Sequence, residues 1–134
     1  MNPIAIGVDV VDVERVERML ARHGDRALGR VLTEQEREYC QRMAAPSRHV
    51  AARLAAKEAA YKALAVDDDA GWIGWLEVEV RRDGQGRPSL LFHGRAQAAA
   101  ARLGVHSAMV SLTHSEASAA AVVLLVGEGA SEPR

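Results

Sequence analysis

Residues 53–64 read RLAAKEAAYKAL, and this stretch fixes the centre of the fold. Its alanines, leucines and long polar side chains favour a helix, and no glycine or proline interrupts it. One stripe of the predicted helix contains Val50, Leu54, Glu58, Tyr61 and Ala65. The pattern therefore predicts that the Glu58 carboxylate faces the core. A buried carboxylate is costly without a compensating charge, so we expect Lys62, another basic residue or a metal ion beside Glu58.

The segments around this helix predict both strands and further helices. Apolar or alternating runs indicate strands at 4–11, 75–82, 88–93, 108–113 and 119–126. Helical spacing indicates helices at 12–22, 33–43 and 95–103. Thr33 and Glu36 form a capping box, Ser47 is expected to cap the central helix, and that helix is expected to end near Ala65. This mixed order of elements favours an α+β fold.

Length, charge and cysteine content restrict the class of protein. The 134 residues suffice for one domain, expected over 1–126, and residues 127–134 lack core-forming side chains and predict a flexible tail. A net charge of −1 favours neither nucleic acid nor membrane as a partner, and no apolar run approaches a membrane span. The single Cys40 excludes an internal disulfide and suits a reducing cytoplasm. Without a basic neighbour in sequence, Cys40 is interpreted as a small hydrophobe rather than a nucleophile.

Asp9 and Glu58 are the first candidate site. Asp9 interrupts an apolar strand, and Glu58 lies on the central helix, so both carboxylates sit in apolar surroundings. Together they could hold Mg²⁺, which prefers oxygen ligands and often takes the remainder from substrate phosphates and water. From spacing alone the simpler interpretation is favoured, in which Asp9 caps the following helix and Glu58 pairs with Lys62.

Basic residues on the central helix form the second candidate. Arg53 and Lys57 are four residues apart, and Lys62 follows Glu58 by four. Such a row could hold a diphosphate and stabilise a leaving phosphate. A solvated surface with i,i+4 ion pairs explains the same spacing equally well.

Arg15, Arg18 and Arg22 share one face of the first predicted helix. A positive stripe of this kind could steer an acidic protein surface towards the molecule. Taken alone, the stripe is more simply interpreted as a solvated face, helped by a pair between Glu14 and Arg18.

Ser111 and His114 lie close together near the end of a predicted strand. The segment has no nucleophile-elbow pattern, so it does not predict a hydrolase. His114 is interpreted from its position alone as a simple polar contact.

Three blocks of the sequence resemble the holo-acyl-carrier-protein synthases, a branch of the 4′-phosphopantetheinyl transferases. They are IGVDVV at 6–11, RLAAKEAAYKA at 53–63 and VSLTH at 110–114, in that order. The Lys-Glu-Ala-x-x-Lys core of the middle block is the most specific of them, and the hairpin Gly84–Pro88 is a softer match. The resemblance covers the chain to about residue 126 and implies one small antiparallel sheet packed on a long central helix.

The resemblance implies a magnesium-dependent enzyme that transfers 4′-phosphopantetheine from coenzyme A to a serine of an apo acyl carrier protein. By similarity, Asp9 and Glu58 ligate Mg²⁺, which neutralises and orients the diphosphate. Glu58 is the expected base for the serine proton, directly or through a water. Lys62 is expected to stabilise the leaving adenosine 3′,5′-bisphosphate, which makes it both a catalytic and a coenzyme-binding residue.

The family also predicts where the partners bind. Arg53 and His114 resemble contacts to the adenosine end of coenzyme A. The arginines at 15, 18 and 22 resemble the docking surface for the acidic helix of a carrier protein of fatty-acid or polyketide type. Members of this branch are small trimers, so we expect a homotrimer in which part of the coenzyme pocket comes from the next subunit.

The sequence departs from the family pattern in the loop after the central helix. Asp67–Asp69 replace a glycine-rich turn, and the expected structure is a solvated loop rather than an additional metal site. Ser118 stands where many relatives carry an aromatic residue. The alternative function is a non-catalytic module of the same fold that binds a carrier protein or a nucleotide.

Overall fold

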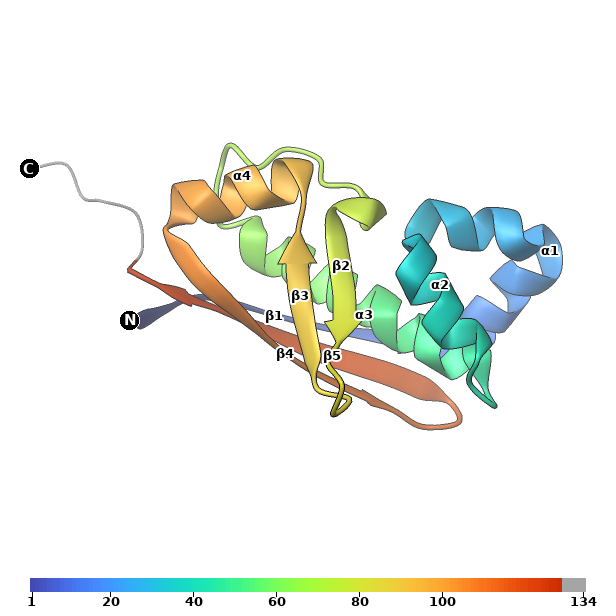
Figure 1. Ribbon diagram of the computed structural model, residues 1–134. Helices are drawn as coiled ribbons and strands as arrows, with labels where there is room; N and C mark the ends of the chain where they lie inside the picture. Colours follow the sequence, from blue (N-terminus) through green and yellow to red (C-terminus); the bar gives the residue numbers. More distant parts are fainter. Residues whose placement is uncertain (129–134) are drawn as a thin grey trace, which may run out of the picture.

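A computed structural model describes residues 1–128, which form a three-stranded antiparallel sheet, a separate hairpin and helices around one long helix (Figure 1). The elements are β1 (Asn2–Asp12), α1 (Val13–Val31), α2 (Glu34–Gln41), α3 (Pro46–Leu64), the 3-10 turn η1 (Trp75–Glu77), β2 (Val78–Arg82), β3 (Pro88–Phe92), α4 (Gly94–Leu103), β4 (Val105–His114) and β5 (Ser118–Gly127). The predicted α+β fold is confirmed. None of the described helices is long and apolar enough to cross a membrane.

The long helix α3 packs across one face of the sheet, whose strand order is β1-β5-β4. Its alanines are small enough to let the strands come close, and those at 51, 55, 56, 59, 60 and 63 are fully buried. Gly7 makes the closest approach, since an added Cβ there would clash with the backbone carbonyl of Ala59. Because side chains alternate along a strand, Asp9 points to the same α3-facing side as Gly7.

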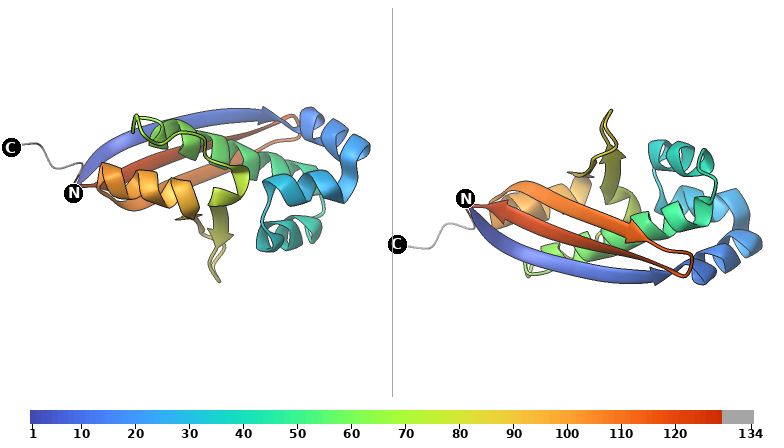
Figure 2. Two further views of the ribbon diagram at one scale, coloured as in Figure 1. Left: turned by 90° about the horizontal axis from the view of Figure 1, so that it is seen from above. Right: turned by 90° about the horizontal axis from the view of Figure 1, so that it is seen from below.

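The other face of the three-stranded sheet has no helix across it (Figure 2). The side chains of Ile6, Val8 and Val10 from β1, Met109 from β4 and Val122 from β5 are exposed there. Contiguous apolar surface of this kind is uncommon on a monomeric protein and indicates an interface.

Lys57 anchors α2 and the η1–β2 segment to α3. Its ammonium donates to Glu36 Oε1 at 2.8 Å and to the backbone oxygens of Trp75 and Val78 at 2.8 and 2.7 Å. Burial lowers the pKa of Lys57, against the opposite effect of the Glu36 carboxylate. With its donors used internally, Lys57 cannot serve a phosphate. Lys57 therefore belongs neither to a phosphate-binding row nor to a solvated surface, the two alternatives that its spacing left open.

Several predicted helix boundaries change. The helix expected at 12–22 continues to Val31, with a kink at Gly24, whose φ is +55°. The Thr33–Glu36 capping box is confirmed. Ser47 does not cap α3, because the helix starts one residue earlier at Pro46, where the missing N–H of proline costs nothing.

The predicted strands also shift. The first three residues of the strand expected at 75–82 form η1 instead. Gly127, expected in the tail, still belongs to β5. The remainder of the tail, 129–134, lies outside the described residues.

Candidate active site

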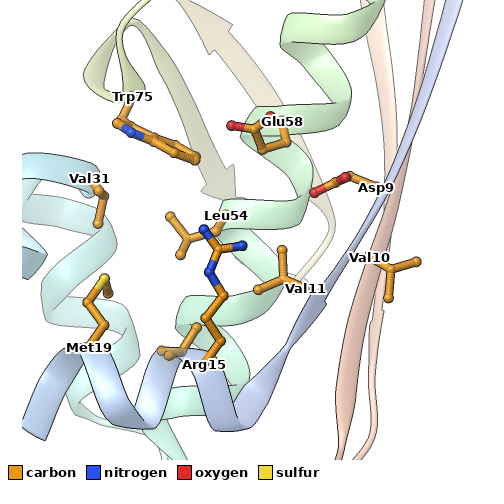
Figure 3. Close-up of a pocket in the computed structure, with 10 residues that line it drawn as sticks. Asp9, Val10, Val11, Arg15, Met19, Val31, Leu54, Glu58 and Trp75 are labelled. Atoms are coloured by element: carbon orange, nitrogen blue, oxygen red, sulfur yellow. The ribbon is translucent and has the colours of Figure 1, made fainter.

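Asp9 and Glu58 line one cavity of about 480 Å³ between β1, α1 and α3 (Figure 3). The lining residues are Asp9, Val10, Val11, Arg15, Val16, Met19, Val31, Leu54, Glu58 and Trp75. The close contact of Gly7 with α3 brings the β1 carboxylate and the α3 carboxylate to the same opening. Their separation in the sequence gave no evidence that Asp9 and Glu58 are close, and the fold brings both to the same cavity.

The environment of Glu58 differs from the prediction. Glu58 is half-buried rather than part of the core-facing stripe, and Tyr61 on that stripe is exposed. The α3 helix is buried on most of its circumference. A residue with apolar neighbours on the helical wheel is therefore not necessarily buried itself, as Glu58 shows. Among residues 1–128, Glu58 makes no ion pair, which leaves its carboxylate free for a ligand in the cavity.

Lys62 pairs with Asp9 instead of Glu58. The Lys62 ammonium lies 2.9 Å from Asp9 Oδ1 and also donates to the Val8 carbonyl at 3.2 Å. Asp12, not Asp9, occupies the position before α1, and it forms no side-chain cap. The simpler interpretation, in which Asp9 caps a helix and Glu58 pairs with Lys62, is therefore wrong in both parts. Asp9, Glu58 and Lys62 nevertheless lie at one place.

The cavity has a charged side and an apolar side. Asp9, Glu58 and Arg15 supply charges, whereas Met19 and Leu54 supply apolar surface. In the view of Figure 3, Glu58 lies between Asp9 and Trp75. Paired carboxylates beside a lysine and an arginine can hold a hard divalent cation together with a phosphorylated ligand, because the net charge of the group is then balanced.

Arg53 lies in a different, strongly basic hollow of about 330 Å³ between α2 and β2. Arginines at 42, 53, 81 and 82 line it. The Arg53 guanidinium stacks on Tyr39, 4.1 Å from the ring centroid, and its Nε has no hydrogen-bond partner although it is buried. A buried guanidinium with an unused donor favours an anionic ligand in this hollow.

His114 reaches the same region through two aromatic contacts. The His49 ring lies between Tyr39 and His114, with centroid distances of 5.9 and 4.8 Å. Burial lowers the pKa of His49, and the neighbouring His114 and Arg53 act in the same direction. The two predicted coenzyme contacts, Arg53 and His114, are therefore grouped with each other, and neither lines the Asp9–Glu58 cavity.

The arginine stripe on α1 adjoins the cavity. Arg15, Arg18 and Arg22 line a shallow hollow of about 270 Å³ together with Met19 and His23. Arg15 also lines the Asp9–Glu58 cavity, so the stripe leads directly to its opening. The predicted contact between Arg18 and Glu14 is present at 3.4 Å, between highly exposed side chains.

Several features of the site were missed from the sequence. Trp75, in the segment interpreted as a strand, forms part of the cavity wall, and its position after a glycine was the only signal.

Asp67 does not simply face solvent, because Arg102 of α4 binds it at 2.8 Å. Within the described part of the chain, no cluster of three metal-binding side chains occurs, at Asp67–Asp69 or elsewhere. Cys40 is buried, and burial raises its pKa to about 11, as expected for an unreactive thiol.

Comparison with known proteins places this geometry in a family. The family model for the 4′-phosphopantetheinyl transferase superfamily matches residues 5–123. The holo-acyl-carrier-protein synthase of Koribacter versatilis is 43% identical over 122 residues, which cover 91% of this chain and 97% of that protein.

Two solved structures are similar over nearly their whole length. The holo-acyl-carrier-protein synthase of Helicobacter pylori, in complex with coenzyme A, matches with a TM-score of 0.75 and 25% identity, covering 90% of this chain and 99% of that one. The Bacillus anthracis synthase, in complex with CoA (3′,5′-ADP), matches with a TM-score of 0.70 and 31% identity. The match covers 96% of this chain and 98% of that one.

Proposed function

Because the chain belongs to the 4′-phosphopantetheinyl transferase superfamily, in its holo-acyl-carrier-protein synthase branch, we propose that the Asp9–Glu58 cavity is its transfer site. The protein transfers 4′-phosphopantetheine from coenzyme A to a serine of an apo acyl carrier protein, and adenosine 3′,5′-bisphosphate leaves. The observation that carries the site assignment is the convergence of Asp9, Glu58 and Lys62, from β1 and α3, at one opening beside the α1 arginines.

Asp9 and Glu58 fit Mg²⁺ as its protein ligands. Both offer carboxylate oxygens to the same cavity, and Glu58 has no competing ion pair among the described residues. Two carboxylates with room for a phosphorylated ligand suit this ion, which keeps waters and shares its coordination with phosphates. When bound, Mg²⁺ would neutralise and orient the diphosphate of coenzyme A.

The chain's own residues then divide the chemistry. Glu58 accepts the proton of the carrier serine as the bond to phosphorus forms, either directly or through a water. Lys62 Nζ carries a positive charge beside Asp9, and its exposed stem lets it follow the negative charge that develops on the departing bisphosphate. The pair with Asp9 holds Lys62 at the opening until a phosphate competes for it.

The adenosine end of coenzyme A belongs, in this proposal, to the hollow lined by Arg53, to which His114 is linked through the rings of His49 and Tyr39. That hollow lies outside the Asp9–Glu58 cavity of the same chain, so a complete site needs the hollow of a second copy. The apolar outer face of the sheet supplies a surface for such contacts, with Ile6 67% and Met109 59% exposed. We therefore propose a homotrimer with shared sites.

The carrier protein is proposed to dock on the α1 stripe. Arg15, Arg18 and Arg22 present positive charge beside the cavity opening, which favours the acidic surface of a carrier helix. A fatty-acid carrier is the first substrate to test, with polyketide carriers as the alternative. The proposed compartment is the cytoplasm, consistent with the single buried free thiol of Cys40.

The experiment mixes the protein with coenzyme A, magnesium and an apo carrier, and weighs the carrier by mass spectrometry. Wild-type protein is expected to add one phosphopantetheine. Glu58→Gln keeps the shape and removes the charge, so we expect kcat to fall by about 10²–10⁴ with the fold unchanged by circular dichroism. Chelation of magnesium should stop transfer by the wild type.

Glu128→Gln is the matched control, since Glu128 is exposed at the end of the described chain, and it should retain full activity. Normal turnover by Glu58→Gln would remove Glu58 from the mechanism.

A further inference from the structure

Glu79 of β2 is a buried carboxylate that the transfer chemistry does not use. It is only 5% exposed, and its strand neighbours Val78 and Val80 are buried as well. Because side chains alternate along a strand, Glu79 lies on the opposite face of β2 from the two valines. An apolar side chain would fill that position without the cost of burying a charge. A carboxylate there is therefore expected to have specific partners.

Two side chains far away in the sequence hold the Glu79 carboxylate. Thr33 Oγ1 donates to Glu79 Oε2 at 3.2 Å, and His93 Nε2 lies 3.0 Å from Oε1. Arg81 of the same strand lies 3.6 Å from Oε1. Burial acts to raise the pKa of Glu79, but these three partners together hold that pKa below its ordinary value. The carboxylate is therefore ionised and can only accept, so His93 Nε2 carries the proton of this contact.

The Thr33 hydroxyl joins Glu79 to the start of α2. Thr33 is the N-cap of α2, and its oxygen accepts a hydrogen bond from Glu36 N at 3.3 Å. The single proton of the hydroxyl goes to Glu79. Glu36 forms a second attachment, because its Oε2 accepts from Val80 N at 2.9 Å. One attachment would let this short helix pivot on β2, whereas two attachments fix its direction.

The direction of α2 matters because α2 and β2 form two walls of the basic hollow. The Tyr39 ring of α2 contacts two arginines of that hollow, with its centroid 4.1 Å from the Arg53 guanidinium and 5.5 Å from that of Arg82. Within the described part of the chain, both arginines keep a buried Nε without a hydrogen-bond partner. The bonds of a guanidinium to an anion depend on alignment, so a turn of α2 that moves Tyr39 would disturb them.

We propose that Glu79 is a positioning residue, which fixes α2 against β2 through Thr33 and so aligns the arginines of the basic hollow for an anionic ligand. The inference rests on the proposed function, in which that ligand is the adenosine end of coenzyme A. Glu79 does not itself line the hollow, so it acts through α2 rather than on the ligand. His93, which precedes α4, holds the other oxygen of the carboxylate in place.

The sign of the effect separates positioning from simple electrostatics. Glu79 precedes Val80 and Arg81, which both line the hollow. Removal of a negative charge beside a basic hollow should by itself strengthen the binding of an anion. Loss of alignment should weaken it. Glu79→Gln removes the charge and keeps the shape of the side chain, so weaker binding by this variant would reveal the positioning role.

Enzyme kinetics and calorimetry measure this effect. Glu79→Gln should raise the KM for coenzyme A about tenfold and leave kcat near the wild-type value, because Glu58 and its cavity are unchanged. The Kd of adenosine 3′,5′-bisphosphate should rise by the same factor. Glu34→Gln is the matched control, since Glu34 is exposed on α2 and does not line the hollow, and it should leave both constants unchanged. A KM that stays the same or falls, or a loss of kcat alone, would overturn the proposal.

Substitutions of Thr33 keep the proposal testable if Glu79→Gln does not fold. Thr33→Val keeps the shape and removes the hydroxyl, so it should weaken the binding of the bisphosphate. Thr33→Ser keeps the hydroxyl and should bind as the wild type does. Equal binding by the two Thr33 variants would contradict a role for the link to Glu79.

The outcomes separate this proposal from the proposed function. If the wild type loads a carrier and Glu79→Gln binds the bisphosphate equally well, the positioning role fails and the transferase function stands. If the wild type binds the bisphosphate but loads no carrier, the proposed function fails, and the comparison of Kd values still decides the role of Glu79. If the wild type neither loads a carrier nor binds the bisphosphate, both proposals fail.

Discussion

Lys57 and Glu58 are neighbours in sequence, yet the fold gives their side chains different surroundings. The Lys57 side chain is 1% exposed and meets Glu36 at 2.8 Å, whereas Glu58 opens to the cavity. One turn of helix thus presents a buried cation to the interior and a carboxylate to the cavity. We propose that the two neighbours have separate purposes, stability for Lys57 and chemistry for Glu58.

Removing the Lys57 charge tests this division. Lys57→Met leaves the buried Glu36 carboxylate without its cation, so we expect the free energy of unfolding to fall by about 3–5 kcal/mol in urea denaturation. Lys62→Met is the matched control, because the Lys62–Asp9 pair is partly solvated, and its loss should cost at most about 1 kcal/mol. Equal losses in the two variants would contradict the structural role of Lys57.

Among the elements, α1 connects its arginine stripe to the Asp9–Glu58 cavity. Arg15 lines both, and the Gly24 kink turns the second half of the helix away from the direction of the first. The arrangement places positive charge at the cavity opening, so a docked acidic helix would present its serine close to Glu58. Charge on α1 is therefore expected to affect the carrier and not the coenzyme.

Reversing a charge on α1 tests this expectation. Arg18→Glu should raise the KM for the carrier by about tenfold at low salt, with a smaller effect at high salt because ions screen exposed charges. The KM for coenzyme A should stay unchanged. Arg30→Glu, on the same helix beyond the kink, serves as the comparison and should have a smaller effect. A change in the KM for coenzyme A alone would argue against docking on α1.

At the scale of the whole molecule, the uncovered sheet face and the two separate hollows support the same assembly. Ile6 and Val8 are exposed in the single chain, and Arg53 with its unused Nε lies apart from Glu58. Burying the apolar face between copies would remove it from water and could bring the basic hollow of one copy to the transfer cavity of another. The assembly would then be a condition for activity.

Disrupting the sheet face tests the assembly. Ile6→Glu places a charge on the outer face without touching the α3-facing core, so the subunit should fold but sediment as a monomer with little transfer activity. A fully active monomer would contradict shared sites.

A mixing experiment provides the control. Glu58→Gln and Arg53→Ala chains, each inactive alone, should regain part of the activity when unfolded and refolded together, because some sites then combine two intact halves. No recovery from a properly assembled mixture would place both halves in one chain.

Most of the helices and strands, and the family, could be predicted from the amino-acid sequence alone. Periodicity, capping and turn residues act over a few positions, which is why the long helix, the Thr33–Glu36 box and the β2–β3 hairpin were predictable. The blocks around Asp9, Glu58 and His114 were distinctive enough to indicate the family. The stripe containing Glu58 was misjudged, because a helix covered on most sides offers no simple polar face.

Which of these residues meet depends on tertiary packing. The pairing of Lys62 with Asp9 and the burial of Lys57 against Glu36 join positions far apart in the chain, and residues of α2 and β2 complete the hollow around Arg53. The Lys62–Asp9 contact depends on how closely β1 lies on α3, an approach that Gly7 permits through the absence of a Cβ. Local propensity carries no information about this distance, because it arises from the packing of distant segments.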